Sequence, residues 1–468
     1  MANDTNNSSS DKKELIHSPI ISKPWFYLSI GSLLLAGLMS LAFIFGRAPF
    51  ISKIFTDPMW VKRVLVVHVD LALIIFLYSF ICGMFLLIPR NNTKLILQKP
   101  ALYLAIIGTL ILIFNLAIPN TTPVLNNYVP VLDHKLYLVG LLLFGISLIM
   151  VLANRYLFFN YSKYEELEFK ILAKDAIPAL QASAILFIVS IILFVISYFQ
   201  TEKGLPTQTY YEFMMWGGGH ILQFVNAAAT VAVWLMLFKK ITKRTALSYK
   251  FSAILFIIYV IPPLFSPLLI QDGTSSGTYY IGFSQYMRWG IFPIVSTIII
   301  VLFYQLWKAG KEKLYEEKAL QNPLFNGLIV SMTFMSLGFL IGAAIRGLGP
   351  NTLTPAHYHS TLGSVTIAFM TATYFLMEVY GKPFPTVKVK KLAAKQPFVF
   401  GIGMLLFVIG FAYAGSHGLE RKKFGTDQII ATNEAMIGLI IAGIGGLLAV
   451  TGGIMFLIAI WKSFKGAK

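Results

Sequence analysis

The chain has 468 residues, of which 57% are hydrophobic and only 12% are charged, whereas a typical soluble domain carries roughly 25% charged residues. Apolar runs long enough to cross a ~30 Å hydrocarbon core recur along almost the whole length, which excludes a soluble globular domain. The net charge of +18 does not indicate nucleic-acid binding, because the basic residues lie in short connections between the apolar runs, where they act as topology signals.

The apolar runs predict an all-α membrane protein with about twelve transmembrane helices. The first 22 residues are mostly polar, so we expect a disordered cytoplasmic tail over 1–22 and one membrane domain over 23–468. The predicted spans, in chain order, are 25–46, 63–88, 100–118, 133–153, 179–199, 211–238, 250–270, 279–307, 325–347, 356–380, 397–416 and 435–461. The one cysteine, Cys82, lies inside an apolar run, which excludes a disulfide and a covalently attached c-type haem.

Lysine and arginine are divided unevenly between the two sides of the membrane. With both termini on the cytoplasmic side, 27 of these residues lie on that side and 10 on the other, while Arg288 lies within a span. Because cytoplasmic loops carry the excess of positive charge, the count predicts a multi-pass protein of the bacterial cytoplasmic (inner) membrane with both termini inside. An even number of spans agrees with this topology.

Histidines are concentrated at the outer side of the predicted bundle. Of the seven in the chain, His68, His220, His357 and His359 lie near the outer starts of the second, sixth and tenth spans. Ionisable side chains at such depth are costly and rare, which favours a functional site. A single histidine there could be a structural hydrogen-bonding residue, but four at matched depth favour a cofactor site.

The spacing of His357 and His359 indicates two cofactors. Two residues along a helix correspond to a rotation of about 200°, so the two imidazoles leave the helix on nearly opposite faces. One metal could not easily bind both, whereas two haems, one on each side, could. Imidazole is a common axial ligand of haem iron. His68, on the second span, is the candidate for the second axial ligand of a low-spin haem.

With this pattern the chain resembles subunit I of the haem-copper oxidase superfamily, which includes cytochrome c oxidases and nitric oxide reductases. The motif PAHYHSTLG at 355–363 and the motif WGGGH at 216–220 carry the resemblance. The resemblance implies that His68 and His359 are the axial pair of a low-spin haem and that His357 is the proximal ligand of a high-spin haem. It implies that His220 is a ligand of a second metal facing that haem.

The loop between the last two spans reads GSHGLERKK at 415–423 and lies on the outer side, against the positive-inside bias. In the family a basic pair at this place binds haem propionates, and Arg421 and Lys422 match it. Charge-assisted contacts with carboxylates are strong in partly dry sites. The alternative interpretation is a solvated cluster of charges.

The sequence departs from the family at the second metal. The seventh span reads YVIPPLFSPLLI at 259–270 and lacks the two adjacent histidines that complete the family's copper site. His220 alone is a poor site for copper or non-haem iron. Four residues later, Phe224 stands where related oxidases often carry a tyrosine and nitric oxide reductases a glutamate. Tyr259 is a candidate substitute for that catalytic tyrosine, and Asp70 is expected to bond near the low-spin haem or pack against helix polar groups.

Three functions remain open at this stage. The first is a respiratory oxidoreductase that passes electrons from low-spin to high-spin haem and reduces O2 or a nitrogen oxide, with other subunits and a cytochrome c or cupredoxin-type donor as partners. The second is a non-catalytic two-haem protein for electron transfer or gas sensing that has lost the copper site. The third is a haem-free transporter, which the absence of repeated halves disfavours.

Overall fold

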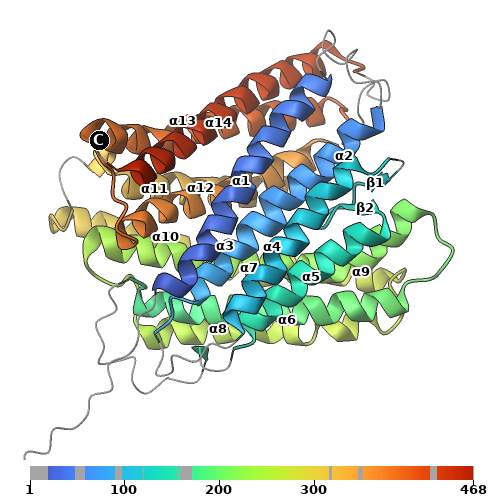
Figure 1. Ribbon diagram of the computed structural model, residues 1–468, viewed down its shortest axis with the longest axis horizontal. Coiled ribbons are helices and arrows are strands. Elements are labelled where there is room, and N and C mark those ends of the chain that lie inside the picture. Colours follow the sequence, from blue (N-terminus) through green and yellow to red (C-terminus); the bar gives the residue numbers. More distant parts are fainter. Residues whose placement is uncertain are drawn as a thin grey trace, which may run out of the picture.

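The computed structural model describes residues 19–47, 58–89, 97–119, 121–154, 157–158, 171–315, 319–345, 351–421 and 430–466. Within these ranges, 12 helical spans are long and apolar enough to cross a membrane. The bundle confirms the all-α membrane fold that the sequence predicts (Figure 1). Helix α1 begins at Pro19, so residues 19–22 of the segment predicted as a tail are helical, and residues 1–18 lie outside the described residues.

The spans follow one another with few other elements between them. The first six are α1 (Pro19–Arg47); α2 (Pro58–Val69) with η2 (Asp70–Ile75) and α3 (Phe76–Phe85); α4 (Gln98–Phe114) with η3 (Asn115–Ala117); α5 (Lys135–Leu152); η6 (Lys174–Ala176) with α6 (Ile177–Gln200); and α7 (Thr207–Thr242). The last six are α8 (Tyr249–Leu264) with η7 (Ser266–Ile270); α9 (Gly277–Tyr286) with η8 (Met287–Ile291) and α10 (Phe292–Lys311); η9 (Ala319–Gln321) with α11 (Pro323–Ala344); α12 (Leu353–Val379); α13 (Val387–Ser416); and α14 (Asn433–Lys465). Strands β1 (Thr122–Val124) and β2 (Val131–Asp133) form an antiparallel hairpin between α4 and α5.

The helix bundle has a terminal end, where α1 begins and α14 ends, and a hairpin end, where the β1–β2 hairpin lies. At the terminal end, the start of α1 meets the ends of α12 and α14, where Ser22 Oγ lies 2.8 Å from the Tyr380 hydroxyl and Lys382 donates to the Phe464 carbonyl at 3.3 Å. The β1–β2 hairpin lies at the opposite end, the hairpin end, on the right in Figure 1. Since the spans alternate in direction, α2, α7 and α12 all begin at the hairpin end. The candidate histidines therefore lie in helices that start at the same side.

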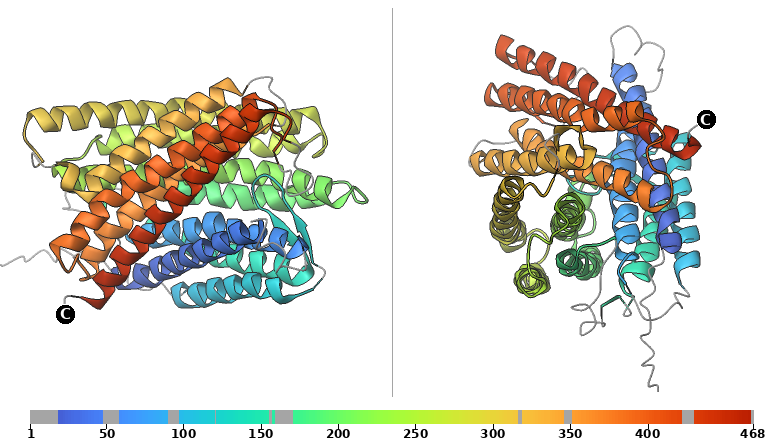
Figure 2. Two further views of the ribbon diagram at one scale, coloured as in Figure 1. Left: turned by 90° about the horizontal axis from the view of Figure 1, so that it is seen from above. Right: turned by 90° about the vertical axis from the view of Figure 1, so that its left-hand side faces the viewer.

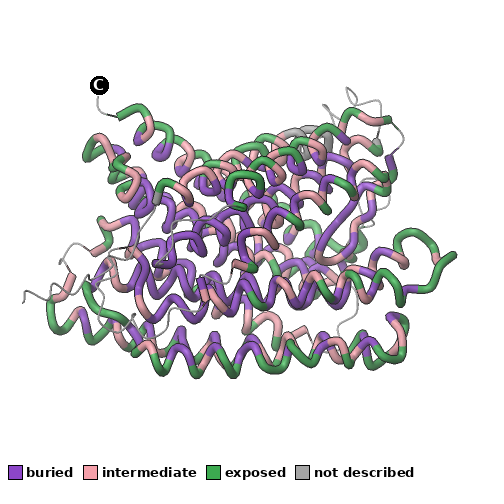
Figure 3. The backbone as a smooth tube through the Cα atoms, turned by 60° about the horizontal axis from the view of Figure 1, so that its bottom comes forward, coloured by how far each residue is buried: buried purple, intermediate pink, exposed green. Residues whose placement is uncertain are grey.

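Helix α7 is the centre of the bundle. It has 36 residues and is buried on almost all sides, which is the behaviour of a helix that is apolar all round. Figure 3 shows the buried residues concentrated in the middle and the exposed ones on the outward faces. Exposed large apolar side chains on the peripheral helices are expected, because hydrocarbon rather than water covers them.

Helices α13 and α14 pack against each other through glycines and lie side by side at the edge of the bundle (Figure 2). A Cβ at Gly403 would lie 2.2 Å from the backbone nitrogen of Ala449, and one at Gly410 would lie 2.4 Å from the carbonyl oxygen of Gly438. Small residues at a membrane helix interface allow this close approach of backbones. The pair supports α12, against which α13 packs.

Candidate functional site

His68 lies near the end of α2, directly before a π-helical segment. Its Nδ1 lies 2.8 Å from the carbonyl oxygen of Ala36 on α1. The π-helical segment η2 begins at Asp70, and π-helical turns inside α-helices are frequent at functional sites. The side chain keeps accessible surface although it lies within a membrane span.

Asp70 and His68 contact different helices. Asp70 is fully buried, and the hydroxyl of Tyr137 on α5 donates to its Oδ2 at 2.5 Å. Its Oδ1 has no hydrogen-bond partner among the described residues. Of the two roles that the sequence left open for Asp70, the structure shows contact with a polar group of a neighbouring helix.

His357 and His359 leave α12 toward different helices, as their spacing predicts. Nδ1 of His357 lies 2.7 Å from the carbonyl oxygen of Gly338 on α11, and a Cβ at Gly342 would lie 2.8 Å from the ring. The ring of His359 instead packs against Phe407 on α13, with centroids 4.7 Å apart. Each imidazole thus has its own surroundings.

The hydrogen bonds of His68, His357 and His359 fit haem ligation. In all three, Nδ1 is bonded to a backbone carbonyl, which can only accept, so Nδ1 carries the proton and Nε2 keeps its lone pair. Nε2 has no hydrogen-bond partner among the described residues in any of them, and each side chain keeps accessible surface. This tautomer, with Nδ1–H fixed by a carbonyl, is the one that metal-bound histidines adopt.

His68 and His359 come from spans that pack against each other, since the Phe80 ring on α3 stacks on the Phe369 ring on α12 with centroids 4.3 Å apart. They belong to α2 and α12, far apart in the sequence. Two imidazoles with open Nε2 atoms on packed spans fit a donor set for haem. His357 faces the other side of α12 and is separate from this pair.

Arg421 lies in the loop that follows α13, at the hairpin end of the bundle, where α12 begins. Thr352, at the start of α12, donates its backbone N–H to the Leu419 carbonyl at 3.0 Å, and Asn351 forms an antiparallel bridge with Glu420. The loop is therefore fixed to the start of α12. Arg421 is near enough to Tyr128, in the β1–β2 connection, for its charge to oppose the rise in the pKa of that hydroxyl. Lys422, predicted as its partner, lies outside the described residues.

His220 differs from the other three. It is 1% exposed, its Nδ1 lies 2.8 Å from the Trp216 carbonyl and its Nε2 lies 3.0 Å from the hydroxyl of Tyr128. Because the carbonyl requires a proton on Nδ1, Nε2 of the neutral ring accepts and Tyr128 donates. Burial and the nearby carboxylate of Glu212 raise the pKa of the Tyr128 hydroxyl, against the opposing charge of Arg421, so it stays protonated as a donor.

Tyr128 is the residue that sequence reasoning missed. It lies in the connection between β1 and β2. The sequence feature that points to such a neighbour is the glycine run 217–219 on α7, beside His220. A Cβ at Gly217 would lie 3.0 Å from the ring of Phe283, one at Gly218 2.5 Å from Phe194 and one at Gly219 2.4 Å from Cβ of Tyr128. Aromatic side chains from several elements thus approach this turn of α7. The run indicates crowding around His220, but does not name the partners.

Tyr259 does not form a hydrogen bond with His220. Its hydroxyl donates to the backbone carbonyl of Phe224 at 3.0 Å, and its ring packs against the Phe224 ring with centroids 5.2 Å apart. Phe224 is one helical turn beyond His220, about 6 Å farther along α7. Of the remaining histidines, His417 bonds the Tyr413 carbonyl through Nδ1 at 2.9 Å.

A second metal does not fit the described residues. No three His, Cys, Asp or Glu side chains come together among them in a group that could hold a metal ion. His220 uses both ring nitrogens within the protein. The donor set thus fits haem at His68, His357 and His359 but not a metal at His220.

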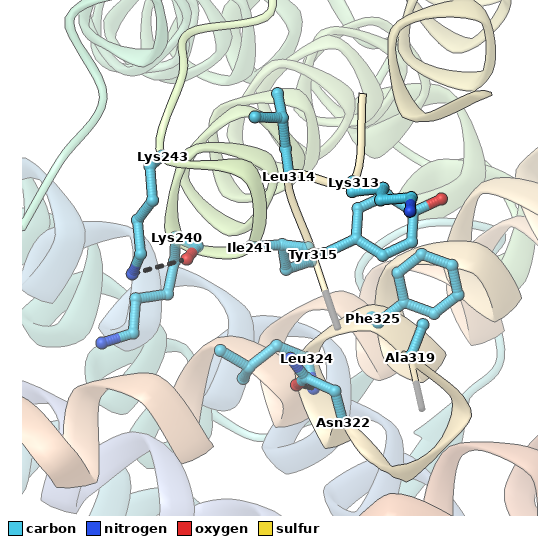
Figure 4. Close-up of a pocket in the computed structure, with 10 residues that line it drawn as sticks. All are labelled: Lys240, Ile241, Lys243, Lys313, Leu314, Tyr315, Ala319, Asn322, Leu324 and Phe325. Carbon is cyan, nitrogen blue, oxygen red and sulfur yellow. Dashed lines mark hydrogen bonds between the residues drawn. The ribbon is translucent and has the colours of Figure 1, made fainter. Parts of the chain in front are cut away.

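A cavity of about 470 Å³ lies at the terminal end and is separate from the histidines (Figure 4). It lies between the end of α7 and the segment that leads into α11, and three lysines line it, Lys240, Lys243 and Lys313. Lys243 Nζ donates to the Lys240 carbonyl at 3.2 Å, and Lys240 pairs with Glu378. Since Lys240 follows His220 by 20 residues on one helix, the cavity is about 30 Å from it.

Two proteins are similar to this chain in sequence over most of its length. An uncharacterised protein of Rickettsia prowazekii is 26% identical, covering 97% of this chain and 98% of that protein. An uncharacterised protein of Aquifex aeolicus is also 26% identical, over 85% of this chain and 94% of that protein.

A solved structure of a haem-copper terminal oxidase dimer matches the fold with a TM-score of 0.75 and 17% identity, over 96% of this chain and 85% of that chain. At that identity the match shows the fold alone. The family model described as Cytochrome C and Quinol oxidase polypeptide I matches residues 20–448. The chain therefore belongs to this family and is a haem-copper oxidase subunit I-like membrane protein.

Proposed function

We propose that this chain is the haem-binding subunit of a respiratory oxidoreductase, in which electrons pass from a low-spin to a high-spin haem to reduce O2 or a nitrogen oxide. Family membership supports the respiratory oxidoreductase role. The observation that carries the finer proposal is the set of three open Nε2 atoms, two of them on packed spans and the third on the opposite side of α12.

In this proposal the protein residues orient and tune the cofactors. His68 and His359 would hold the low-spin haem, and His357 would hold the high-spin haem. When bound, the haems supply one-electron transfer and an open iron position for a diatomic gas. The carbonyls of Ala36, Pro355 and Gly338 fix the three imidazoles as Nδ1–H tautomers, which sets their direction and raises their basicity.

Arg421 supports the same arrangement. Its position over the start of α12 suits a contact with haem propionates that point to the hairpin end. A guanidinium binds a carboxylate through two parallel hydrogen bonds, so it positions the group as well as neutralising it. We assign Lys422 the same role by its neighbouring place in the sequence.

The surroundings of the proposed enzyme follow from the topology. The lysine and arginine bias supports a hairpin end on the outer side of a bacterial cytoplasmic membrane and termini in the cytoplasm. A cytochrome c or cupredoxin-type donor, with other respiratory subunits, would then deliver electrons from the outer side.

A reduced-minus-oxidised visible spectrum of the purified protein, with and without CO, tests the proposal. We expect the bands of two haems, of which one shifts when CO binds. Consumption of O2 or NO by the reduced protein would establish turnover. A protein purified in folded form without haem bands would contradict the proposal.

A specific observation favours a second candidate, a two-haem protein for electron transfer or gas sensing without turnover. Both nitrogens of His220 are bonded within the protein, and the α8–η7 span carries no histidine. CO binding to one haem without any consumption of O2 or NO would support this candidate over the enzyme.

A further inference from the structure

We infer that His220 binds no metal in this chain, because Tyr128 occupies the ring nitrogen that a metal would need. A hydrogen-bonded tyrosine–histidine pair thus replaces the second metal that the family resemblance implies. The inference rests on the proposed function in one respect, since the second-metal position is defined by its place beside the high-spin haem.

Both ring nitrogens of His220 are engaged within the protein. A neutral imidazole has one N–H and one lone pair. Nδ1 donates to the Trp216 carbonyl at 2.8 Å, and the Nε2 lone pair accepts from the Tyr128 hydroxyl at 3.0 Å. His68, His357 and His359 each keep the same lone pair free of any bond to the described residues. The contrast within one protein separates the three haem-ligand candidates from His220.

The turn that carries Tyr128 is held in place beside α7. Asn126 Oδ1 accepts the backbone N–H groups of Tyr128 at 3.2 Å and of Val129 at 2.9 Å, which fixes the turn that carries the ring. Asn127 donates to Glu212 on α7. Cβ of Tyr128 lies where a side chain at residue 219 would have to go, which makes Gly219 a requirement of the contact. The backbone that carries Tyr128 is therefore held beside His220.

Phe224 and Tyr259 supply no further metal ligand beside His220. Phe224 fills the next turn of α7, and its ring packs where a Cβ at Gly290 would lie 2.6 Å away. Tyr259 donates to a backbone carbonyl and not to His220. Divalent copper needs several nitrogen donors, and one imidazole whose nitrogens are both used cannot supply them.

Metal analysis of the purified protein, expressed with added copper and iron, is the main experiment. Wild type and His220→Ala should both contain copper and non-haem iron at least about tenfold below the haem content. A metal that His220→Ala retains is bound elsewhere and supports the inference. One copper or non-haem iron per chain that His220→Ala loses would overturn it, and so would a stoichiometric second metal in wild type if that variant does not fold.

Chemical modification tests the role of Tyr128 directly. Diethyl pyrocarbonate acylates an imidazole nitrogen that has a free lone pair, and peptide mass spectrometry locates the adduct. Tyr128→Ala should raise the modified fraction of His220 at least about tenfold over wild type, because it frees Nε2. Equal modification of His220 in wild type and in Tyr128→Ala would overturn the inference.

Tyr280→Ala is the matched control. The Tyr280 ring stacks on Trp216 at 3.8 Å, beside His220, without a hydrogen bond to it. Its removal opens similar space but leaves Nε2 bonded, so His220 should stay unmodified. An increase equal to that of Tyr128→Ala would show that packing alone protects His220, and would overturn the role given to the hydroxyl.

The haem content of the same samples separates the two proposals. A protein without haem contradicts the proposed function, while unmodified His220 and the absence of a second metal would still support the Tyr128–His220 pair. A protein with two haems and a metal on His220 supports the proposed function and overturns the inference.

Discussion

The ring of His357 bonds to α11 and the ring of His359 packs against α13, although the two residues are only two positions apart on α12. Nδ1 of His357 lies 2.7 Å from the Gly338 carbonyl, and the His359 ring lies 4.7 Å from the Phe407 ring. Helix geometry requires this divergence, because two residues turn a helix by about 200°. One helix can thereby serve two cofactors with different surroundings.

Substitution of His68 by alanine should remove the low-spin haem and spare the other. In the proposed assignment His68 binds only the low-spin haem, while His357 is held by the Gly338 carbonyl on α11, so loss of the His68 imidazole leaves the ligand of the high-spin haem intact. We expect the reduced spectrum to lose the low-spin bands while the CO-induced shift remains. His417→Ala is the control, since His417 lies on the hairpin-end loop and bonds only to nearby residues of that loop and helix. Loss of the CO shift in folded His68→Ala would contradict the assignment.

Substitution of Gly342 by alanine should have the opposite spectral effect. Its Cβ would lie 2.8 Å from Cε1 and Nδ1 of His357, so the ring must move from its position against α11. Overpacking of this kind costs about 1–3 kcal/mol. We expect a weakened CO-binding signal with unchanged low-spin bands. Gly443→Ala, where a Cβ meets nothing within 4 Å, should leave both signals unchanged. An unaltered CO signal in Gly342→Ala would contradict the role of His357.

The helices and three haem-ligand candidates are predictable from sequence because their signals are local. A hydrophobic run long enough for the membrane predicts a span, and the separation of His357 and His359 predicts two directions. The helix ends are less predictable: α13 begins at Val387, ten residues before the predicted 397, because the Thr386 hydroxyl caps the Val389 N–H and the lysine-rich first turns continue the helix. Hydropathy measures the apolar core and not these polar ends.

The contact between Tyr128 and His220 is not predictable in this way. It joins residues 92 positions apart and depends on the register of the β1–β2 hairpin and on the turn fixed by Asn126. Neither feature has a sequence signature that names its partner on α7. The sequence offers Tyr259 as a candidate, since it lies on the span where the family's missing histidines would be, yet its hydroxyl donates to a backbone carbonyl.

Substitution of Arg421 by alanine should lower the midpoint potential of at least one haem. A positive charge near a haem favours the reduced state, so its loss shifts the potential downward by some tens of millivolts. Arg421→Lys keeps the charge and should keep most of the potential. A spectroelectrochemical titration measures both variants. Arg244→Ala, which removes an exposed cation paired with Glu312 at the terminal end, is the control. Equal potentials in wild type and Arg421→Ala would contradict the role of Arg421.

Substitution of Tyr137 by phenylalanine should destabilise the bundle. The Tyr137 hydroxyl is the hydrogen-bond donor to Oδ2 of the fully buried Asp70, and the other carboxyl oxygen has no partner among the described residues. A buried polar group left without its partner costs about 1–3 kcal/mol. The measurement is the apparent Tm in detergent, followed by the release of haem. Tyr103→Phe is the control, because Tyr103 is 64% exposed on the outward face of α4. Equal losses in Tm for both variants would contradict the role of the buried pair.

Labelling of single cysteines should establish which end of the bundle faces the cytoplasm. Cys82 is the only cysteine of the chain and is fully buried, so a membrane-impermeant maleimide should not reach it. Lys203→Cys places an exposed thiol at the hairpin end, and Lys388→Cys places one at the terminal end. Because 27 lysines and arginines lie on the side of the termini against 10 on the other, Lys203→Cys should be labelled in intact cells and Lys388→Cys only after permeabilisation. The reverse pattern would place Arg421 and the proposed electron entry on the cytoplasmic side and would exclude an outer-side donor.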